Sequence, residues 1–166
     1  MKFIKDRNKI VNESNEISKK DRSWVSRYVV GGYINEDGEI ETLNGIVNLK
    51  NNSTITHFPI KFANCIEFNI SFCENLKNLY NSPDVVRHFA ASNCRSLIDL
   101  KGISKDILEV LRLSFSTNIR SFDGLSKLPP IVSALDLAYP KEVLISCWEK
   151  GITPDELENF KSDWEI

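Results

Sequence analysis

The chain has 166 residues, of which 42% are hydrophobic and 27% charged, and its formal net charge at pH 7 is −2. This length and composition are ordinary for one soluble globular domain with a substantial core. No apolar run approaches the ~18 residues that a membrane span requires. Residues 1–7 also lack the apolar core of a signal peptide, so we expect neither membrane insertion nor secretion by that route.

Charge is unevenly distributed along the chain. Residues 1–30 carry eight Lys and Arg against four Asp and Glu, whereas residues 141–166 carry three against seven. A basic segment can contact nucleic acid, but no Lys/Arg cluster with interleaved aromatic residues accompanies this one. The pattern therefore does not favour a nucleic-acid partner. It is explained as well by charges solvated on a helix, or by chain ends that lie near a protein partner.

The first elements in chain order are a helical segment and a hairpin. Ile10, Ile17 and Trp24 recur at a spacing of seven residues, which predicts one or two amphipathic helices in residues 1–30. Residues 31–45 predict a β-hairpin, because the glycine of Asp37-Gly38 tolerates the positive φ of a tight turn. We interpret both segments as a cap that covers an exposed strand edge.

Four blocks then follow the pattern L-x-L-x-x-N-x-x-L-x-x-L, with aliphatic residues, Phe or Ala at the L sites. They are residues 47–58, 68–79, 89–100 and 111–122, and a partial fifth copy is assigned to Leu135-Asp136-Leu137. The starts lie 21, 21, 22 and 24 residues apart. This period is typical of a leucine-rich repeat solenoid. We predict an α/β repeat fold over residues 46–140, with short parallel strands and few or no convex α-helices.

Each repeat can bury its apolar side only against a neighbour. Because side chains alternate along a strand, the first and third positions of a block should point inward. These residues are Val47 and Leu49, Phe68 and Ile70, Phe89 and Ala91, Leu111 and Leu113, and Leu135 and Leu137. The later apolar sites should fill the same core: Ile55, Leu76, Leu97 and Ile119, then Phe58, Leu79, Leu100 and Phe122.

The sixth position of the blocks holds Asn52, Cys73, Cys94 and Ser116. The chain turns there inside the coil, so we expect a small side chain that pairs a backbone group. Cysteine is small and stable when buried, which predicts a structural role for Cys73 and Cys94. The four cysteines match no zinc motif, and we predict no metal or other cofactor. We expect reduced thiols in a cytosolic protein; a Cys73–Cys94 disulfide across stacked turns is the alternative.

Two further helices are predicted at the C-terminal end. Residues 141–150 place apolar side chains at helical spacing, and Gly151 is a suitable stop. Residues 153–156 form a capping box with proline at the first helical position, and Leu157, Phe160 and Trp164 continue as an apolar stripe. We interpret residues 141–166 as a helical cap. Contact of the aromatic stripe with a partner is the alternative.

Three groups of residues carry a resemblance to a known family. They are Tyr33-Ile34-Asn35-Glu36-Asp37-Gly38, Phe58-Pro59-Ile60-Lys61-Phe62, and the blocks at residues 71–79 and 92–97. Through them, residues 28–140 resemble small leucine-rich repeat proteins encoded by tailed bacteriophages and some bacteria. The chain departs from that pattern by Cys where Asn is usual and by Ala91 at a core site. The resemblance implies an accessory protein in the cytoplasm of a bacterial host, one that binds or inhibits a host protein.

The sequence contains no catalytic motif. It lacks the phosphate-binding loop G-x-x-x-x-G-K, the zinc motif H-E-x-x-H and the nucleophile elbow G-x-S-x-G. His57 and His88 are isolated, which favours surface residues over general bases. We therefore predict a non-enzymatic protein, with a virion-associated structural protein and, less favoured, a small hydrolase as alternatives.

Repeat proteins bind their partners mostly on the continuous concave sheet. The fifth positions of the blocks, at the edge of that sheet, are Asn51, Phe72, Asn93, Phe115 and Tyr139. Aromatic residues and arginine commonly anchor protein interfaces. We predict a protein-binding surface formed by Phe72, Phe115, Tyr139, Arg112, His88, Glu67, Asn69, Lys50 and Asp136. In the alternative interpretation, the three aromatic side chains pack beneath the adjacent repeat or the C-terminal helix.

Overall fold

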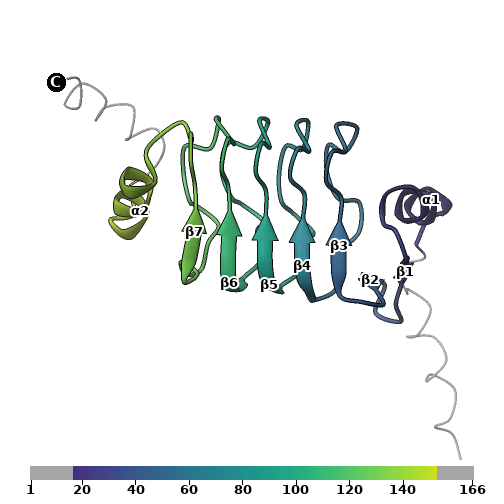
Figure 1. The fold of residues 1–166 in the computed structure, drawn as a ribbon. Coiled ribbons are helices and arrows are strands. Elements are labelled where there is room, and N and C mark those ends of the chain that lie inside the picture. The colour runs from purple at the N-terminus through teal and green to yellow at the C-terminus, as the bar shows by residue number, and fades with distance from the viewer. Residues whose placement is uncertain (1–16, 153–166) are drawn as a thin grey trace, which may run out of the picture.

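The computed structural model describes residues 17–152. In chain order the elements are α1 (Lys19–Tyr28), β1 (Gly32–Ile34), β2 (Ile40–Thr42), β3 (Ile46–Asn48), β4 (Cys65–Asn69), β5 (Val85–Ala90), β6 (Asp106–Arg112), β7 (Ile131–Ser133) and α2 (Lys141–Glu149). Strands β3 to β7 form one parallel sheet in sequence order (Figure 1). Since each strand pairs with the next one along the chain, the backbone coils about four times as a parallel β-solenoid.

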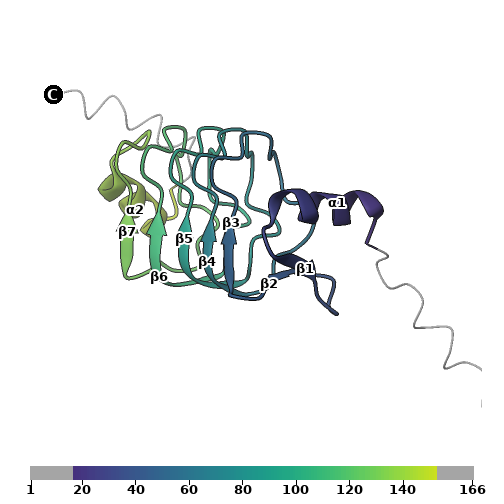
Figure 2. The same ribbon diagram turned by 45° about the vertical axis from the view of Figure 1, so that its right-hand side comes forward.

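The return segments of the coils stack behind the sheet, and none of them contains an α-helix in the described part of the chain (Figure 2). The sixteen core positions predicted for the first four blocks are confirmed, because each is at most 2% exposed. Within this core, the rings of Phe58, Phe62, Phe68 and Phe89 pack against one another at centroid distances of 4.9–5.6 Å. Burial of these apolar side chains between coils is the main force that stacks the repeats.

A ladder of side chains at the sixth position pairs carbonyls inside the coil. Asn52 Nδ2 and Cys73 Sγ both donate to the Leu49 carbonyl, at 3.0 and 3.2 Å. Cys94 Sγ donates to the Ile70 carbonyl at 3.1 Å, and Ser116 Oγ donates to that of Ala91 at 2.6 Å. All four cysteines are free, so the alternative disulfide between Cys73 and Cys94 is not formed. Burial raises the pKa of Cys73 to about 11 and that of Cys94 to about 12, which keeps both thiols protonated as donors.

The interval of 22 residues between the third and fourth blocks arises from a β-bulge. Strands β5 and β6 pair Val86 with Ile107 but His88 with Val110, so Leu108 and Glu109 together lie opposite Arg87. The register is regular again from His88 onward. A bulge of this kind leaves one residue unpaired and changes the direction of nearby side chains.

The fifth repeat begins three residues earlier than predicted. Strand β6 pairs Leu111 with Val132 and Arg112 with Ser133, so the true block starts at Val132. Leu135 was expected to point inward, but it is 60% exposed. Val132 and Ala134 pack against the core in its place. The L-x-L pattern of residues 135–137 predicts the wrong start for the fifth block, because the inward residues Val132 and Ala134 are smaller than leucine.

Helices α1 and α2 lie at opposite ends of the solenoid (Figure 1). Helix α1 starts after Ser18, whose hydroxyl accepts the N–H of Asp21. Its Trp24 ring packs edge-on against Phe62 of the first coil, at a centroid distance of 6.4 Å. Helix α2 contributes Leu144, which is 1% exposed, to the common core. None of the helices in residues 17–152 is both long and apolar enough to cross a membrane.

The hairpin expected around Asp37-Gly38 is present, since β1 and β2 pair antiparallel. The side chain of Asn35 accepts the N–H groups of Asp37 and Glu39 across the turn, and Gly38 has a φ of 80°. Two other predictions concern parts of the chain outside the described residues. They are the helical segment within residues 1–16 and the helix expected to start at residue 153.

Candidate protein-binding surface

A row of residues with left-handed backbone follows the ends of the sheet strands. It consists of Asn51, Phe72, Asn93, Phe115 and Asp136, with φ values between 52° and 67°. The chain leaves the sheet here and turns inward to the sixth position, while each N–H of the first four still bonds to the next coil at 2.6–3.0 Å. An L-residue with a Cβ costs roughly 1–2 kcal/mol in this conformation, which Gly adopts routinely and Asn and Asp adopt occasionally. We call these five residues the left-handed row.

Two members of the left-handed row are phenylalanines that lie at the surface. Phe72 is 40% exposed and Phe115 is 47% exposed. They belong to alternate coils, so two strand spacings, or about 10 Å, separate them. Neither the exposed ring nor the backbone conformation favours Phe in the folded state. Strained residues of this kind concentrate at functional sites, which makes the pair a candidate for binding.

Two cations lie on the same part of the sheet face as the phenylalanines. Lys50 Nζ lies 5.5 Å from the centroid of the Phe72 ring, within the range of a cation–π interaction. Arg112 is exposed on β6, three residues before Phe115. Neither cation forms an ion pair with any residue in the range 17–152. Both charges are therefore available to a partner.

Small side chains separate the left-handed row from Arg112. Ser71, Ser92 and Ser114 occupy equivalent positions in three successive coils. The carbonyl of each accepts the N–H of the left-handed-row residue on the preceding coil. Their hydroxyls bond within the sheet: Ser71 Oγ accepts the N–H of Ser92, and Ser114 Oγ accepts that of Leu135, each at 3.3 Å. We call these three residues the serine row. It presents little bulk between the phenylalanines and the arginine.

The third predicted aromatic residue lies elsewhere. Tyr139 is only 8% exposed and belongs to the buried core, which corrects its placement at the sheet edge. The fifth position of the last repeat is held instead by Asp136, with a φ of 52°. This correction follows directly from the three-residue shift of the fifth block. The alternative that the aromatic residues are buried thus holds for Tyr139 and not for Phe72 or Phe115.

Glu67 and His88 pair across β4 and β5, nearer the strand starts, whereas Asn69 ends β4 in line with Ala90 and Arg112. All three residues take part in polar contacts next to the serine row. His88 Nε2 lies 2.9 Å from Glu109 Oε2, and Arg87 Nε lies 3.1 Å from Glu109 Oε1. Asn69 Nδ2 donates to Glu67 Oε1 at 3.5 Å. Sequence reasoning missed Glu109, which lies at the bulge and contacts Arg87 and His88 from there. The only sequence signal was the extra residue in the 22-residue interval.

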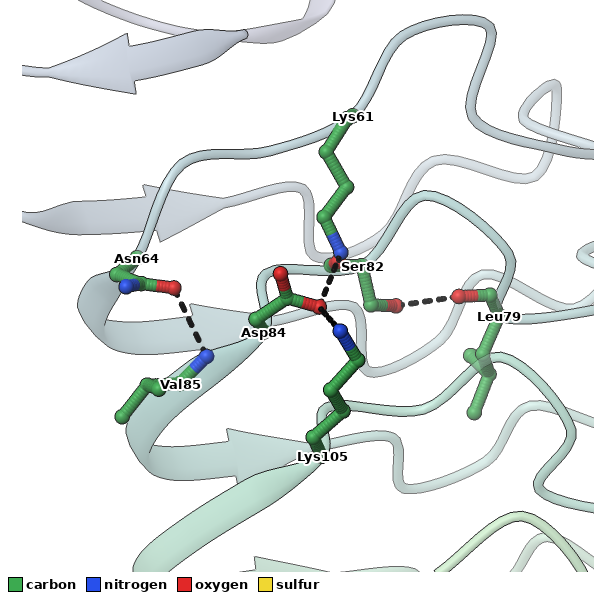
Figure 3. A network of polar contacts seen from close by, with 7 residues as sticks. All are labelled: Lys61, Asn64, Leu79, Ser82, Asp84, Val85 and Lys105. Carbon is green, nitrogen blue, oxygen red and sulfur yellow. Dashed lines mark hydrogen bonds and ion pairs between the residues drawn. The ribbon is translucent and has the colours of Figure 1, made fainter.

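A second polar network joins successive coils beside the starts of the strands (Figure 3). Asp84 Oδ1 lies 2.9 Å from Lys61 Nζ and 3.2 Å from Lys105 Nζ. Lys61 also donates to the Ser82 carbonyl, and Ser82 Oγ donates to the Leu79 carbonyl at 2.7 Å. The hydrogen bond from Lys61, followed by that from Lys105, holds the pKa of Asp84 below its usual value. Because every cation here has a carboxylate or carbonyl partner, we interpret this network as structural.

Two cavities among the described residues lie away from the two phenylalanines. One of about 310 Å³ is lined by residues 40–45, 47 and 63–66, where β2 leads into the first coil. Another of about 260 Å³ lies beside α1, next to Trp24 and Tyr28. Burial raises the pKa of Cys65, in the first cavity, to about 12, so its thiol is a poor nucleophile at neutral pH. No group of three His, Cys, Asp or Glu among residues 17–152 is placed to hold a metal ion.

The left-handed row thus combines strained backbone with two exposed aromatic rings. Lys50 and Arg112, which form no ion pair within residues 17–152, lie on the same part of the sheet face. These features make this part of the sheet face the candidate binding surface. The chain matches no protein-family model, and no curated protein or solved structure matches it.

Proposed function

We propose that the protein is a non-enzymatic protein-binding module and that Phe72 and Phe115 anchor its partner. One observation carries the proposal: both phenylalanines occupy left-handed positions where the other coils have Asn or Asp. Asparagine would satisfy this backbone at lower cost, and it would leave no apolar ring in water. A partner that buries both rings gives these residues a function that the folded chain alone does not.

The proposal extends to the type of solenoid and to the role of its ends. The short repeat and the Asn/Cys/Ser ladder support a leucine-rich repeat, and the packing of Trp24 and Leu144 supports helical caps. With both ends covered, the sheet face is the broad surface that stays open to a partner. The resemblance of residues 28–140 to phage-encoded repeat proteins supports a host protein as that partner, in a bacterial cytoplasm.

The experiment compares three forms of the protein on bacterial cytosol. The first is wild type, the second is Phe72→Asn/Phe115→Asn, and the third is Tyr80→Ser/Ile98→Ser. Tyr80 and Ile98 are 57% and 60% exposed on the return segments, so the third form removes apolar side chains that are more exposed than the two phenylalanines from the opposite side. A retained protein is identified by mass spectrometry, purified, and titrated against each form by calorimetry.

Truncation of an interface anchor costs about 2 kcal/mol or more, which is at least roughly 30-fold in Kd. We expect a loss of that size or larger for the asparagine variant and little change for the control variant. Circular dichroism verifies that all three forms are folded. Equal affinity of wild type and the asparagine variant, or the absence of any protein that distinguishes them, would refute the proposal.

A further inference from the structure

The chemistry of the partner can be read from the spacing of the two phenylalanines and from the charges around them; this step rests on the proposed function. Phe72 and Phe115 lie two strand spacings apart, about 10 Å, in a line that crosses the strands. Asn93 lies between them and is held by a 3.0 Å hydrogen bond from Arg95 Nε. A partner that touches both rings therefore needs two apolar side chains on one side, about 10 Å apart.

An α-helix meets this requirement with residues i and i+7. Seven residues advance the helix by about 10.5 Å, and residues i and i+7 point in nearly the same direction. An extended strand does not meet it, because side chains on one face repeat at about 6.8 Å and then at about 13.6 Å. A polyproline helix repeats at about 9.3 Å and also matches the spacing. The width of the surface is therefore needed to choose between an α-helix and a polyproline helix.

The width of the surface is the distance from the phenylalanines to Arg112 across the serine row. Arg112 precedes Phe115 by three residues on the same coil, which places the two backbone positions about 10 Å apart along the strand direction. Ser114 lies between them, and Ser71 and Ser92 continue the low strip across the sheet. An α-helix with its side chains is about 10–12 Å wide, so it covers the strip from the phenylalanines to the arginine. A polyproline helix is thinner and contacts one border at a time.

The charges of Lys50 and Arg112 indicate which side chains the partner's helix carries beside its apolar ones. Lys50 beside Phe72 and Arg112 beyond the serine row have no ion-pair partner in the described chain. The nearby carboxylate Glu109 is already paired with Arg87 and His88, and Asp136 lies at the far end of the left-handed row. Two available cations next to apolar anchors complement a ligand that carries carboxylates beside its apolar side chains.

We propose that this surface binds an acidic amphipathic helix of the partner, which lies across the strands. Its apolar side chains at i and i+7 contact Phe72 and Phe115, and its carboxylates face Lys50 and Arg112. The recognition mode is that of an apolar helix face on a protein surface, with charge pairs at its border.

A displayed library of 18-residue helical peptides, randomised at the surface positions, tests the proposal. Selection on wild type is combined with counter-selection on Phe72→Asn/Phe115→Asn. We expect enriched peptides to carry a net negative charge and two large apolar residues seven positions apart. Enriched peptides with a net positive charge, with another apolar spacing or with proline repeats would overturn the proposal, as would the absence of enrichment that depends on the phenylalanines.

The best selected peptide is then titrated by fluorescence anisotropy. Lys50→Gln/Arg112→Gln should weaken binding about tenfold or more, whereas Lys77→Gln, which removes an exposed charge from a return segment, should change it less than twofold. Equal weakening by both variants would exclude the assigned charge contacts. If a natural partner is lost on Phe72→Asn/Phe115→Asn but no acidic helical peptide is enriched, the binding function stands and only the helix assignment fails. If neither depends on the phenylalanines, both fail.

Discussion

Replacing Phe72 and Phe115 by asparagine or by alanine separates the cost of their backbone conformation from the contacts of their rings. Both substitutions remove a ring that is about half exposed, which forfeits about 1 kcal/mol of apolar burial per site in either case. The two differ in how well they tolerate a φ of 62–63°. Asparagine is enriched several-fold at positive φ, which corresponds to about 0.6–1 kcal/mol per site in its favour.

The two sites lie about 10 Å apart without shared partners, so the effects should add to about 1–2 kcal/mol. For a domain of this size, that difference raises the melting temperature by about 3–8 °C. We therefore expect Phe72→Asn/Phe115→Asn to melt above Phe72→Ala/Phe115→Ala, measured by circular dichroism with heat and with urea. At Tyr80, which has no positive φ, asparagine should give no advantage over alanine. Equal stability of the two double variants, or the same difference at Tyr80, would refute the reasoning.

Three further predictions concern the core and the coil junctions. The pKa values of Cys73 and Cys94 in the folded protein lie near 11 and 12, above the ordinary value of 9.0. The free energy of unfolding should therefore be constant below about pH 9 and fall above it. Urea titrations between about pH 8 and 10.5 should show a smaller alkaline loss for Cys73→Ser/Cys94→Ser. Asp84→Asn should cost about 0.5–1 kcal/mol at neutral pH, since the carboxylate is half exposed. The difference should shrink as the pH falls through the ordinary carboxyl pKa and vanish below the lowered pKa of the folded state. Gly124→Ala should cost about 2–4 kcal/mol in chemical unfolding, because φ is 109° and the added Cβ would overlap the Leu100 carbonyl; an effect below 1 kcal/mol would contradict this close packing.

The core was predictable wherever large residues marked the period. Phe68 and Leu111 identify their coils because each begins an alternating apolar pattern, and burial on one face of a strand allows only one register. Val132 and Ala134 are too small to outweigh the misleading Leu135 and Leu137, so the last coil was misplaced by three residues. That error alone put Tyr139 on the surface.

The proposed binding surface was predictable in part for a different reason. Strand alternation places Phe72 and Phe115 at the sheet edge, but no sequence rule assigns positive φ to phenylalanine. Their strained backbone, the strongest argument for function, is visible only in the structure. Glu109 was missed because an interval of 22 residues does not reveal where in the coil the additional residue lies.

The bulge in β6 makes the length of a coil locally adjustable. The additional residue is accommodated opposite Arg87, and pairing is regular again before Leu111, so Phe115 still aligns with the left-handed row. A one-residue insertion within a strand therefore need not propagate into neighbouring coils. Evolution or design can therefore lengthen one coil by a residue independently of the others. Such an insertion repositions a single side chain, such as that of Glu109, on the sheet face and preserves the spacing of the two phenylalanines.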